Sequence, residues 1–308
     1  MMDKATVIIP CFNVQEYILD CLDSVMLQGS VVHHTYVVDN NSTDDTFKKV
    51  RQWQKSNPNF PLSLLSETKP GAPAARNLPL NRVQTKWIQF LDADDLLLPG
   101  KIEEQIRQFP NAHVICAGFQ RVSLRGEKKY ALPNPNIPLA LIQGAAGITS
   151  SNLFSTRSIQ SVKGWDESLM SSQEYDLMFR VWQTGAAFQV DLTYKTLVRQ
   201  RPHGQISQRN PAAKWIQLVR LRERMLLHFL TNPEFEDAVK GEMYQSFFDQ
   251  IRNLAKYDLE EAYRSYSRRL KPISFFPKQS PTTTRAYLLC FRFLGFKNTE
   301  RLKRSLSG

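Results

Sequence analysis

The first 122 residues alternate between short apolar runs and longer stretches in which apolar residues recur every three or four positions. Five apolar runs predict buried β-strands, namely residues 6–9, 36–38, 62–65, 87–91 and 113–122. The periodic stretches between them predict helices over residues 14–26, 43–56 and 101–109. Repeated strand–helix units are typical of an α/β fold, so we expect a mostly parallel sheet with helices on both faces.

The second half of the chain has a different pattern. Residues 133–138 are rich in proline and asparagine and predict a loop, and residues 174–184 predict a helix that ends at Gly185. From about residue 211 the apolar periodicity is helical. Three helices are predicted there, over residues 215–229, 234–257 and 259–270. We therefore expect a helical extension at the C-terminus.

The composition is that of a soluble globular protein rather than of a disordered chain, since 42% of the 308 residues are apolar and 22% are charged. The net charge of +11 is uneven, because residues 211–308 hold 18 Lys and Arg against 10 Asp and Glu. This basic region could contact anionic lipid, an anionic polymer or nucleic acid, or it could be a solvated helical surface. No recognised nucleic-acid-binding motif occurs, so we expect no nucleic-acid partner.

The cysteines and the N-terminus predict a cytoplasmic protein, which could also lie at the inner face of the membrane. The four cysteines, at positions 11, 21, 116 and 290, include no C-x-x-C pair. So small a number of cysteines in a chain of 308 residues fits a reducing compartment. Residues 1–10 lack the basic start and apolar run of a signal peptide. No stretch reaches the ~20 apolar residues that a membrane span needs.

Polar and charged residues stand after the first four predicted strands, where parallel sheets bind their ligands. These stretches are residues 10–13, 39–45, 69–77 and 92–95. Asp92 and Asp94 follow a buried strand in Asp-x-Asp spacing, which suits a hard divalent cation with oxygen ligands. A nucleoside diphosphate could complete the shell of such a cation. Taken singly, Asp39 could instead cap a turn or helix, and the acids after Leu91 could form a solvated turn.

Six motifs in order extend this picture over about residues 5–205. They read P-C-F-N, V-D-N-N-S-T-D, G-A-P-A-A-R-N, F-L-D-A-D-D, G-W-D-E and Q-E-Y-D-L. In order and spacing the chain resembles glycosyltransferase family 2, whose members are inverting nucleotide-sugar enzymes with the GT-A fold. The resemblance implies a GT-A catalytic domain over residues 1–210, with a Rossmann-like sheet flanked by helices. Residues 1–98 would form its nucleotide-sugar-binding half and residues 99–210 its acceptor-binding half, followed by a helical basic extension, residues 211–308.

The resemblance also implies which residues bind the donor. Nine residues in or beside the motifs would contact it, namely Pro10, Phe12, Asn13, Glu16, Asp39, Gly71, Arg76, Asp92 and Ala93. Pro10 and Phe12 would line the base pocket, and Asp39 would accept a hydrogen bond from the base, typically uracil. Arg76 would approach the diphosphate or the donor sugar, and the alternative for Arg76 is a surface salt bridge.

The metal and the general base complete the predicted site. Asp94 and His203 would be the protein ligands of Mn²⁺ or Mg²⁺, and the simpler alternative for His203 is an exposed loop histidine. The family commonly has E-D-x-D-L where residues 173–177 read Q-E-Y-D-L, so Glu174 aligns with the aspartate usually assigned as the catalytic base. Asp176 is the second candidate. Either acid could instead be a helix N-terminal residue favoured by the helix dipole.

The resemblance and the strand-end acids together predict a metal-dependent inverting glycosyltransferase. It would move a sugar from a nucleotide diphosphate sugar, with a UDP-sugar expected, to a glycan or lipid-linked glycan in polysaccharide and cell-envelope biosynthesis. The alternative is a non-catalytic nucleotide-sugar or glycan-binding protein of the same fold, which the departure at residues 173–174 would suit. Residues 284–304 interleave aromatic and basic side chains. That pattern suits a peripheral contact with an anionic membrane or a helix packed on the catalytic domain.

Overall fold

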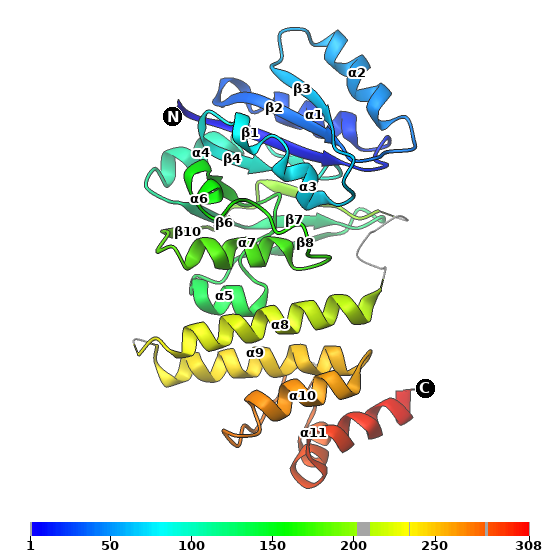
Figure 1. Ribbon diagram of the computed structural model, residues 1–308, viewed down its shortest axis with the longest axis vertical. Coiled ribbons are helices and arrows are strands. Elements are labelled where there is room, and N and C mark those ends of the chain that lie inside the picture. The colour runs from blue at the N-terminus through cyan, green and yellow to red at the C-terminus, as the bar shows by residue number, and fades with distance from the viewer. Residues whose placement is uncertain (1, 202–209, 234, 281–282, 308) are drawn as a thin grey trace. The chain divides into compact units, whose positions relative to one another are not determined.

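The computed structural model describes residues 2–201, 210–233, 235–280 and 283–307 (Figure 1). The chain forms two compact units. The first, which we call the sheet unit, comprises residues 1–137, 144–169 and 173–204. The second, which we call the helical unit, comprises residues 138–143, 170–172 and 205–308.

Within the described residues, a seven-stranded sheet forms the centre of the sheet unit. In spatial order its strands are β10 (Phe188–Asp191), β6 (Val114–Ala117), β9 (Leu153–Ser155), β4 (Thr85–Phe90), β1 (Met2–Cys11), β2 (Val32–Asp39) and β3 (Leu62–Ser66). Neighbouring strands run parallel except β9, which is antiparallel to both β4 and β6. The predicted mostly parallel sheet is confirmed, and its four N-terminal strands occur where the apolar runs predicted them.

Helices cover both faces of this sheet. The helices of the sheet unit are α1 (Ile18–Met26), α2 (Thr46–Ser56), α3 (Ala72–Asn77), α4 (Lys101–Gln108), α6 (Thr156–Ser161) and α7 (Gln173–Trp182). Successive side chains of a strand point to opposite faces, so Val7 and Ile9 of β1 share one core with α1, α2 and α4. On the other face α3 and α6 pack against β1 and β4, where the ring of Phe90 meets that of Trp165 at 5.1 Å. Burial on both faces explains why the strands read as nearly continuous apolar runs.

The predicted fifth strand, residues 113–122, is in fact two strands. β6 ends at Ala117, and β7 (Phe119–Val122) begins after Gly118 in a second sheet. A Cβ atom at Gly118 would lie 2.7 Å from the carbonyl oxygen of Thr193, so glycine allows a close approach of two backbone segments. In the described residues this second sheet has the order β5 (Leu96–Leu97), β11 (Thr196–Arg199), β7 and β8 (Lys128–Ala131). The single strand was wrong because an apolar run does not show that its halves pair with different partners.

The helical unit contains the three helices predicted after residue 211 and a fourth over the segment that interleaves aromatic and basic side chains. They are α8 (Pro211–Leu230), α9 (Asp237–Ala255), α10 (Leu259–Arg269) and α11 (Arg285–Ser307), and α5 (Ile137–Gln143) lies almost wholly in the same unit. Its core centres on the buried ring of Phe248, which is surrounded by the rings of Tyr266, Phe275, Tyr287, Phe291 and Phe296. α11 bends at Gly295, whose φ is 69°. Within the described ranges, every helix is too short or too polar to span a bilayer.

Candidate active site

The carboxyl ends of β1, β2 and β4 bring three of the motifs to one edge of the sheet. β1 lies between β2 and β4, and Cys11 is paired with Asp39 in the register of β1 and β2. On the other side, the backbone N–H of Leu91 donates to the carbonyl oxygen of Ile8 at 3.0 Å. The segments that follow these strands are therefore neighbours, as the parallel topology predicts.

Two of the three carboxylates after β4 are paired with arginines. Asp92 Oδ1 accepts a hydrogen bond from Arg76 Nη2 at 2.6 Å, and Asp94 Oδ2 accepts one from Arg201 Nε at 2.5 Å. The side chains of Asp92 and Asp94 are 40% and 23% exposed, so both acids stay accessible from solvent. Ala93 between them is buried and anchors the turn in the core.

The third carboxylate, Asp95, belongs to the protein interior. Its Oδ2 accepts a hydrogen bond from Ser150 Oγ at 2.6 Å, and the same Oγ accepts from the backbone N–H of Asp92 at 3.1 Å. Burial, and after it the charge of Asp92, raises the pKa of Asp94, and the same two causes raise the pKa of Asp95 well above its usual value. The end of β4 thus brings three carboxyl groups together. A bound cation would stabilise their ionised forms.

Asp94 is the side chain that fits a divalent cation. In the described ranges, no three His, Cys, Asp or Glu side chains gather into a metal-binding group. Mg²⁺, however, is often held by one or two carboxylates, with phosphate oxygens and water completing its shell. The Asp94 carboxylate, partly exposed in an acidic setting, fits such a site as a single protein ligand. The other predicted ligand, His203, lies outside the described residues.

Asp39 presents an unsatisfied acceptor at the end of β2. The residue is 9% exposed, and its Oδ1 is buried without a hydrogen-bond partner among the described residues. Its Oδ2 accepts a long hydrogen bond of 3.4 Å from the backbone N–H of Ser42. An unsatisfied buried polar group costs on the order of 1–3 kcal/mol, which a donor group on a ligand would remove. Of the two alternatives for Asp39, the helix cap is wrong, because α2 begins only at Thr46, whereas the contact with the N–H of Ser42 is that of a turn.

The other residues expected near a nucleotide base follow β1. Phe12 is 39% exposed, Pro10 is partly buried and Glu16 is exposed. Asn13 has a left-handed backbone with φ of 50°, and its N–H donates to Ser42 Oγ at 3.1 Å. Phe12 directly follows Cys11, the register partner of Asp39, so an exposed aromatic ring and an unsatisfied carboxylate oxygen stand at the ends of adjacent strands. A base can use the first as a stacking surface and the second as a hydrogen-bond acceptor.

Asn40 shapes the loop after β3, and the sequence analysis did not identify it. Its Nδ2 donates to the carbonyl oxygens of Glu67 and Lys69 at 2.8 and 2.7 Å, and its Oδ1 accepts from the N–H of Gly71 at 2.7 Å. Asn40 is buried, so these bonds are shielded from water. Gly71 has φ of 125°, a conformation that glycine alone adopts readily. Asn40 therefore fixes the position at which Gly71 was expected to approach the donor.

Arg76 lies behind the acid cluster and links it to α7. Only 5% of Arg76 is exposed, and its Cζ is 4.5 Å from the centre of the Trp165 ring. Besides Asp92, its guanidinium reaches Gln173 Oε1 at 3.5 Å. Arg76 therefore orients Asp92 and places the start of α7 beside the acids.

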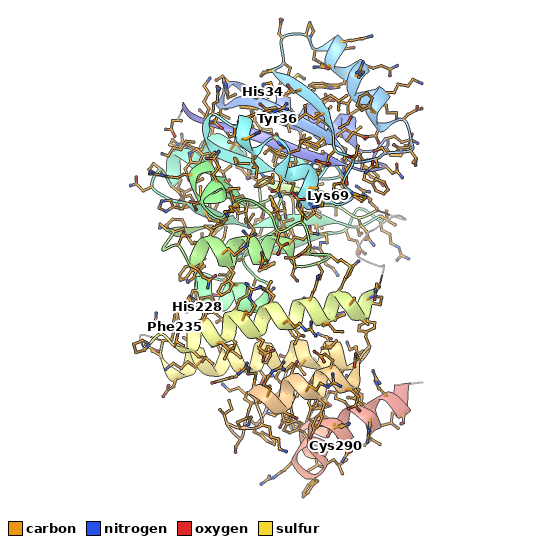
Figure 2. All side chains as sticks on the ribbon, in the orientation of Figure 1. His34, Tyr36, Lys69, His228, Phe235 and Cys290 are labelled. Atoms are coloured by element: carbon orange, nitrogen blue, oxygen red, sulfur yellow. The ribbon has the colours of Figure 1, made fainter. Side chains whose placement is uncertain are left out.

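The G-W-D-E motif is tied to α3. Asn77 Oδ1 accepts from the backbone N–H of Trp165 at 2.8 Å, and Asn77 Nδ2 donates to Glu167 Oε1 at 2.8 Å. Glu167 also pairs with Lys69, which Figure 2 labels near α3, at 2.5 Å. These contacts explain why two distant motifs occur together: each holds the other in place.

The two acids at the start of α7 differ in their surroundings. Asp176 has a side chain only 3% exposed, and its Oδ2 accepts from Arg180 Nε at 2.7 Å. Arg180 also donates to the carbonyl oxygens of Val162 and Gly164, both at 2.8 Å, so this pair closes the connection from α6 to α7. Glu174 is only partly buried and directly follows Gln173, which contacts Arg76. A base must reach its substrate, so the geometry favours Glu174 over Asp176.

Two arginines, one at the end of β11 and one just after it, were also missed. Arg199 at the end of β11 donates from Nε to the carbonyl oxygen of Asp94 at 2.6 Å, and Arg201 pairs with the Asp94 carboxylate. Their alternate positions in the sequence place both on one side of an extended segment. The predicted pairing of His203 with Asp94 on one cation already indicated that this segment reaches Asp94, but no local pattern shows which arginines contact it.

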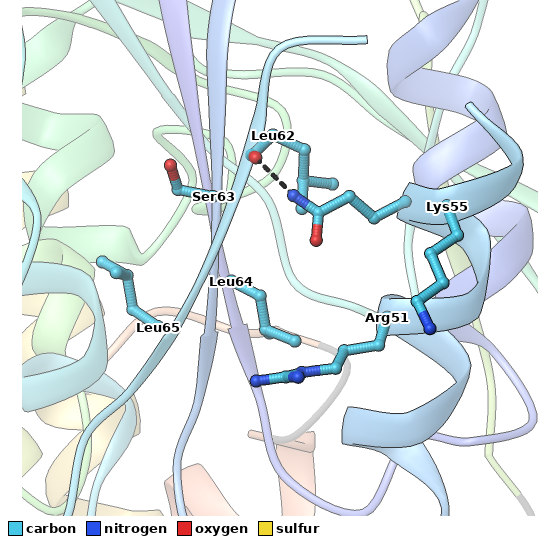
Figure 3. Close-up of a pocket in the computed structure, with 7 residues that line it drawn as sticks. Arg51, Lys55, Leu62, Ser63, Leu64 and Leu65 are labelled. Atoms are coloured by element: carbon cyan, nitrogen blue, oxygen red, sulfur yellow. Dashed lines mark hydrogen bonds between the residues drawn. The ribbon is translucent and has the colours of Figure 1, made fainter. Parts of the chain in front are cut away.

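A cavity of about 380 Å³ lies elsewhere, between α2 and β3 (Figure 3). It is lined by Arg51, Gln54, Lys55 and residues 62–65. The described residues that line it include no acid and no histidine, so it lacks the groups that a metal ion or a general base requires.

Comparison with known proteins agrees with this arrangement. The family model described as Glycosyl transferase family 2 matches residues 6–167. TuaG of Bacillus subtilis (strain 168), a glycosyltransferase assigned by its name to teichuronic acid biosynthesis, is 36% identical over 101 residues, which are 33% of this chain and 40% of that relative. The chain thus spans less than half the length of this relative.

Solved structures share the fold. S. aureus TarS 1–349 in complex with UDP has a TM-score of 0.66 at 18% identity, covering 98% of this chain and 91% of that one. The mannosyltransferase PcManGT from Pyrobaculum calidifontis, in complex with GDP-Man and Mn²⁺, has a TM-score of 0.55 at 16% identity, covering 99% and 87%. At these identities the likeness establishes the expected GT-A fold.

Proposed function

We propose a function from one premise: the chain belongs to glycosyl transferase family 2, whose model matches residues 6–167. It would be an inverting glycosyltransferase that moves a sugar from a UDP-sugar to a hydroxyl group of a glycan or lipid-linked glycan in cell-envelope polysaccharide synthesis. The observation that carries this proposal is the convergence of Asp39, Asp92 and Asp94 at the carboxyl ends of β2 and β4, the strands on either side of β1. The name of TuaG and the UDP bound to TarS support the pathway class and the nucleotide.

The donor would lie across the ends of β1, β2 and β4. Asp39 Oδ1 accepts an N–H of the base, and the exposed ring of Phe12 stacks on it. The diphosphate lies toward Asp92 and Asp94, where a divalent cation, when bound, neutralises the charge of the departing nucleoside diphosphate. Mn²⁺ in the related fold of PcManGT supports this assignment.

Glu174 would act as the general base. It accepts the proton of the acceptor hydroxyl, whose oxygen attacks the anomeric carbon from the face opposite the diphosphate. The bond from that carbon to the diphosphate breaks, the nucleoside diphosphate leaves, and the anomeric configuration is inverted. Arg76 contacts both Asp92 and Gln173, the residue before Glu174. It would thereby fix the position of the base relative to the acids near the leaving diphosphate.

α11 would contact an anionic membrane in which a lipid-linked acceptor resides. On this helix Leu289 and Phe293 are 61% and 76% exposed. The exposed Arg285 and Arg292 lie four residues before and three residues after Leu289, which are helical spacings. The opposite side, with Tyr287 and Phe291, packs in the core of the helical unit. Apolar and basic side chains on one exposed face match the interface of a bilayer with anionic headgroups.

The test is a donor screen with the purified full chain, in which UDP-sugars and GDP-sugars are offered with and without Mn²⁺ and release of the nucleoside diphosphate is measured. We expect turnover of a UDP-sugar that requires the cation and is lost in Asp94→Asn. Binding of a donor without any hydrolysis or transfer, even with glycan acceptors present, would favour the non-catalytic alternative.

A further inference from the structure

Arg201 contacts one oxygen of the Asp94 carboxylate, the group that we propose as the ligand of the cation. Its Nε lies 2.5 Å from Asp94 Oδ2, and its Cζ is 5.2 Å from the centre of the Tyr17 ring. The Arg201 side chain is 16% exposed, so water screens this pair only partly. A guanidinium on that oxygen would repel a divalent cation held by the same carboxylate, because both are positively charged. Both positive groups therefore compete for Asp94.

Arg199, two residues earlier, makes a different kind of contact. Its Nε donates to the main-chain oxygen of Asp94 at 2.6 Å, its Nη1 pairs with Asp20 at 2.6 Å, and its Nη2 donates to the carbonyl oxygen of Tyr17 at 3.1 Å. Its Cζ also lies 5.1 Å from the Tyr17 ring. Arg199 thus fixes the backbone on which Asp94 stands, whereas Arg201 engages the carboxylate itself. Loss of the Arg201 contact would uncover the carboxylate without removing that backbone support.

We propose that Arg201 is the resident counter-ion of Asp94, that an incoming divalent cation displaces it, and that the released guanidinium then binds the diphosphate of the donor. This inference rests on the proposed function. A guanidinium presents two parallel N–H groups that match phosphate oxygens, and it stays charged at every relevant pH. When the cation takes Asp94, the diphosphate brings the negative charge that Arg201 has lost. One arginine would thereby make metal binding and donor binding cooperative.

The exchange makes Arg201→Gln act in opposite directions on two ligands. In calorimetry with Mn²⁺ alone, we expect the variant to bind the cation about tenfold more tightly than wild type, because the competing charge is gone. With Mn²⁺ saturating, we expect UDP to bind the variant about tenfold more weakly, because a phosphate partner is gone. A residue that only supported the fold would weaken both.

Two further variants make the result specific. Arg201→Lys keeps the positive charge, so its Mn²⁺ affinity should stay close to that of wild type, and it guards against misfolding of the glutamine variant. Arg51→Gln removes an arginine that lines the separate cavity between α2 and β3, and it should change neither affinity (Figure 3). Thermal unfolding of each variant verifies that it is folded before binding is measured.

The possible outcomes separate the two proposals. If wild type binds both Mn²⁺ and UDP but Arg201→Gln changes neither affinity, or shifts both in the same direction, the exchange is overturned and the proposed function stands. If wild type binds UDP equally well with and without Mn²⁺, the proposed metal role and the exchange fall together. Opposite shifts, absent in Arg51→Gln, support the exchange.

Discussion

The strand ends of the sheet unit and the core of the helical unit both bury charge, but they do so differently. In the helical unit, Arg252 and Glu300 pair at 2.7 Å with side chains 4% exposed, Tyr287 donates to Glu300, and Arg252 stacks on Tyr287 at 3.6 Å. At the strand ends, three acids crowd together, two of them are reached by solvent, and Asp39 Oδ1 lacks a partner among the described residues. Fully partnered buried charges fix a structure, whereas incompletely partnered acids mark a place for a ligand.

The largest effect should come from the base in the sheet unit. Glu174→Gln removes the proton acceptor, so we expect transfer to slow by about 10²–10⁴-fold, the usual contribution of general-base catalysis, with UDP affinity unchanged. Steady-state turnover and calorimetry on the same sample would measure both.

Asp176→Asn is the matched comparison for Glu174→Gln. It weakens the buried pair with Arg180, so it should lower the free energy of unfolding while the folded enzyme keeps its turnover rate. Near-wild-type turnover by Glu174→Gln would contradict its role as the base. A large rate loss in a stable Asp176→Asn would assign that role to Asp176 instead.

Breaking the ion pair of the helical unit should affect stability instead of chemistry. Arg252→Met leaves Glu300 buried without its charge partner, so we expect the free energy of unfolding to fall by about 3–5 kcal/mol. Urea denaturation measures this loss, and turnover per folded molecule should not change. The double variant Arg252→Met, Glu300→Met should recover part of the stability. If the double variant were less stable than both wild type and Arg252→Met, the unpaired charge of Glu300 would not be the cause of the stability loss.

Much of the fold follows from the sequence, but long-range pairings do not. β1 to β4 contain short apolar runs between helical stretches and were predicted, whereas the three-residue β9 was not, because it exists through its pairing with both β4 and β6. At the site, Asp39 and Asp94 could be grouped because parallel strands end at one edge. The pairing of Arg201 with Asp94 joins residues 107 positions apart, and no local pattern specifies it.

Lys101 is a buried amine in the sheet unit that no carboxylate pairs with among the described residues. Its Nζ contacts Gln89 Oε1, and burial lowers its pKa from 10.5 to about 7, with the charge of Asp191 opposing the shift. Between pH 7 and 10.5 the unfolded chain therefore holds a proton that the folded chain has lost, so stability rises with pH in that window.

Lys101→Met removes that dependence. We expect wild type to gain about 2 kcal/mol of unfolding free energy relative to the variant between pH 7 and 9, at 1.36 kcal/mol per pKa unit. Denaturation curves of both proteins at several pH values measure how this stability difference changes with pH. The other titrating groups are the same in both proteins, and the lost Gln89 contact adds a constant, so neither affects the change. Parallel pH profiles for the two proteins would show that Lys101 stays protonated in the fold.

The smallest effect on the fold should come from the exposed face of α11. Phe293→Ser should change the free energy of unfolding by less than about 0.5 kcal/mol, as exposed substitutions usually do. It should nevertheless reduce sedimentation with vesicles that contain anionic lipid, since Phe293 is 76% exposed beside Arg292. Equal sedimentation of wild type and variant, or none by wild type at low salt, would dismiss α11 as a membrane contact.

We expect the acids after β4 to bind a nucleoside diphosphate through a divalent cation held by Asp94. Calorimetric titration of UDP into folded wild type and Asp94→Asn, each with Mn²⁺ and with a chelator, tests it most directly. Wild type should bind UDP at least about tenfold more tightly with Mn²⁺ than with the chelator, and Asp94→Asn should lose this gain. Equal UDP affinity in all four titrations would contradict it.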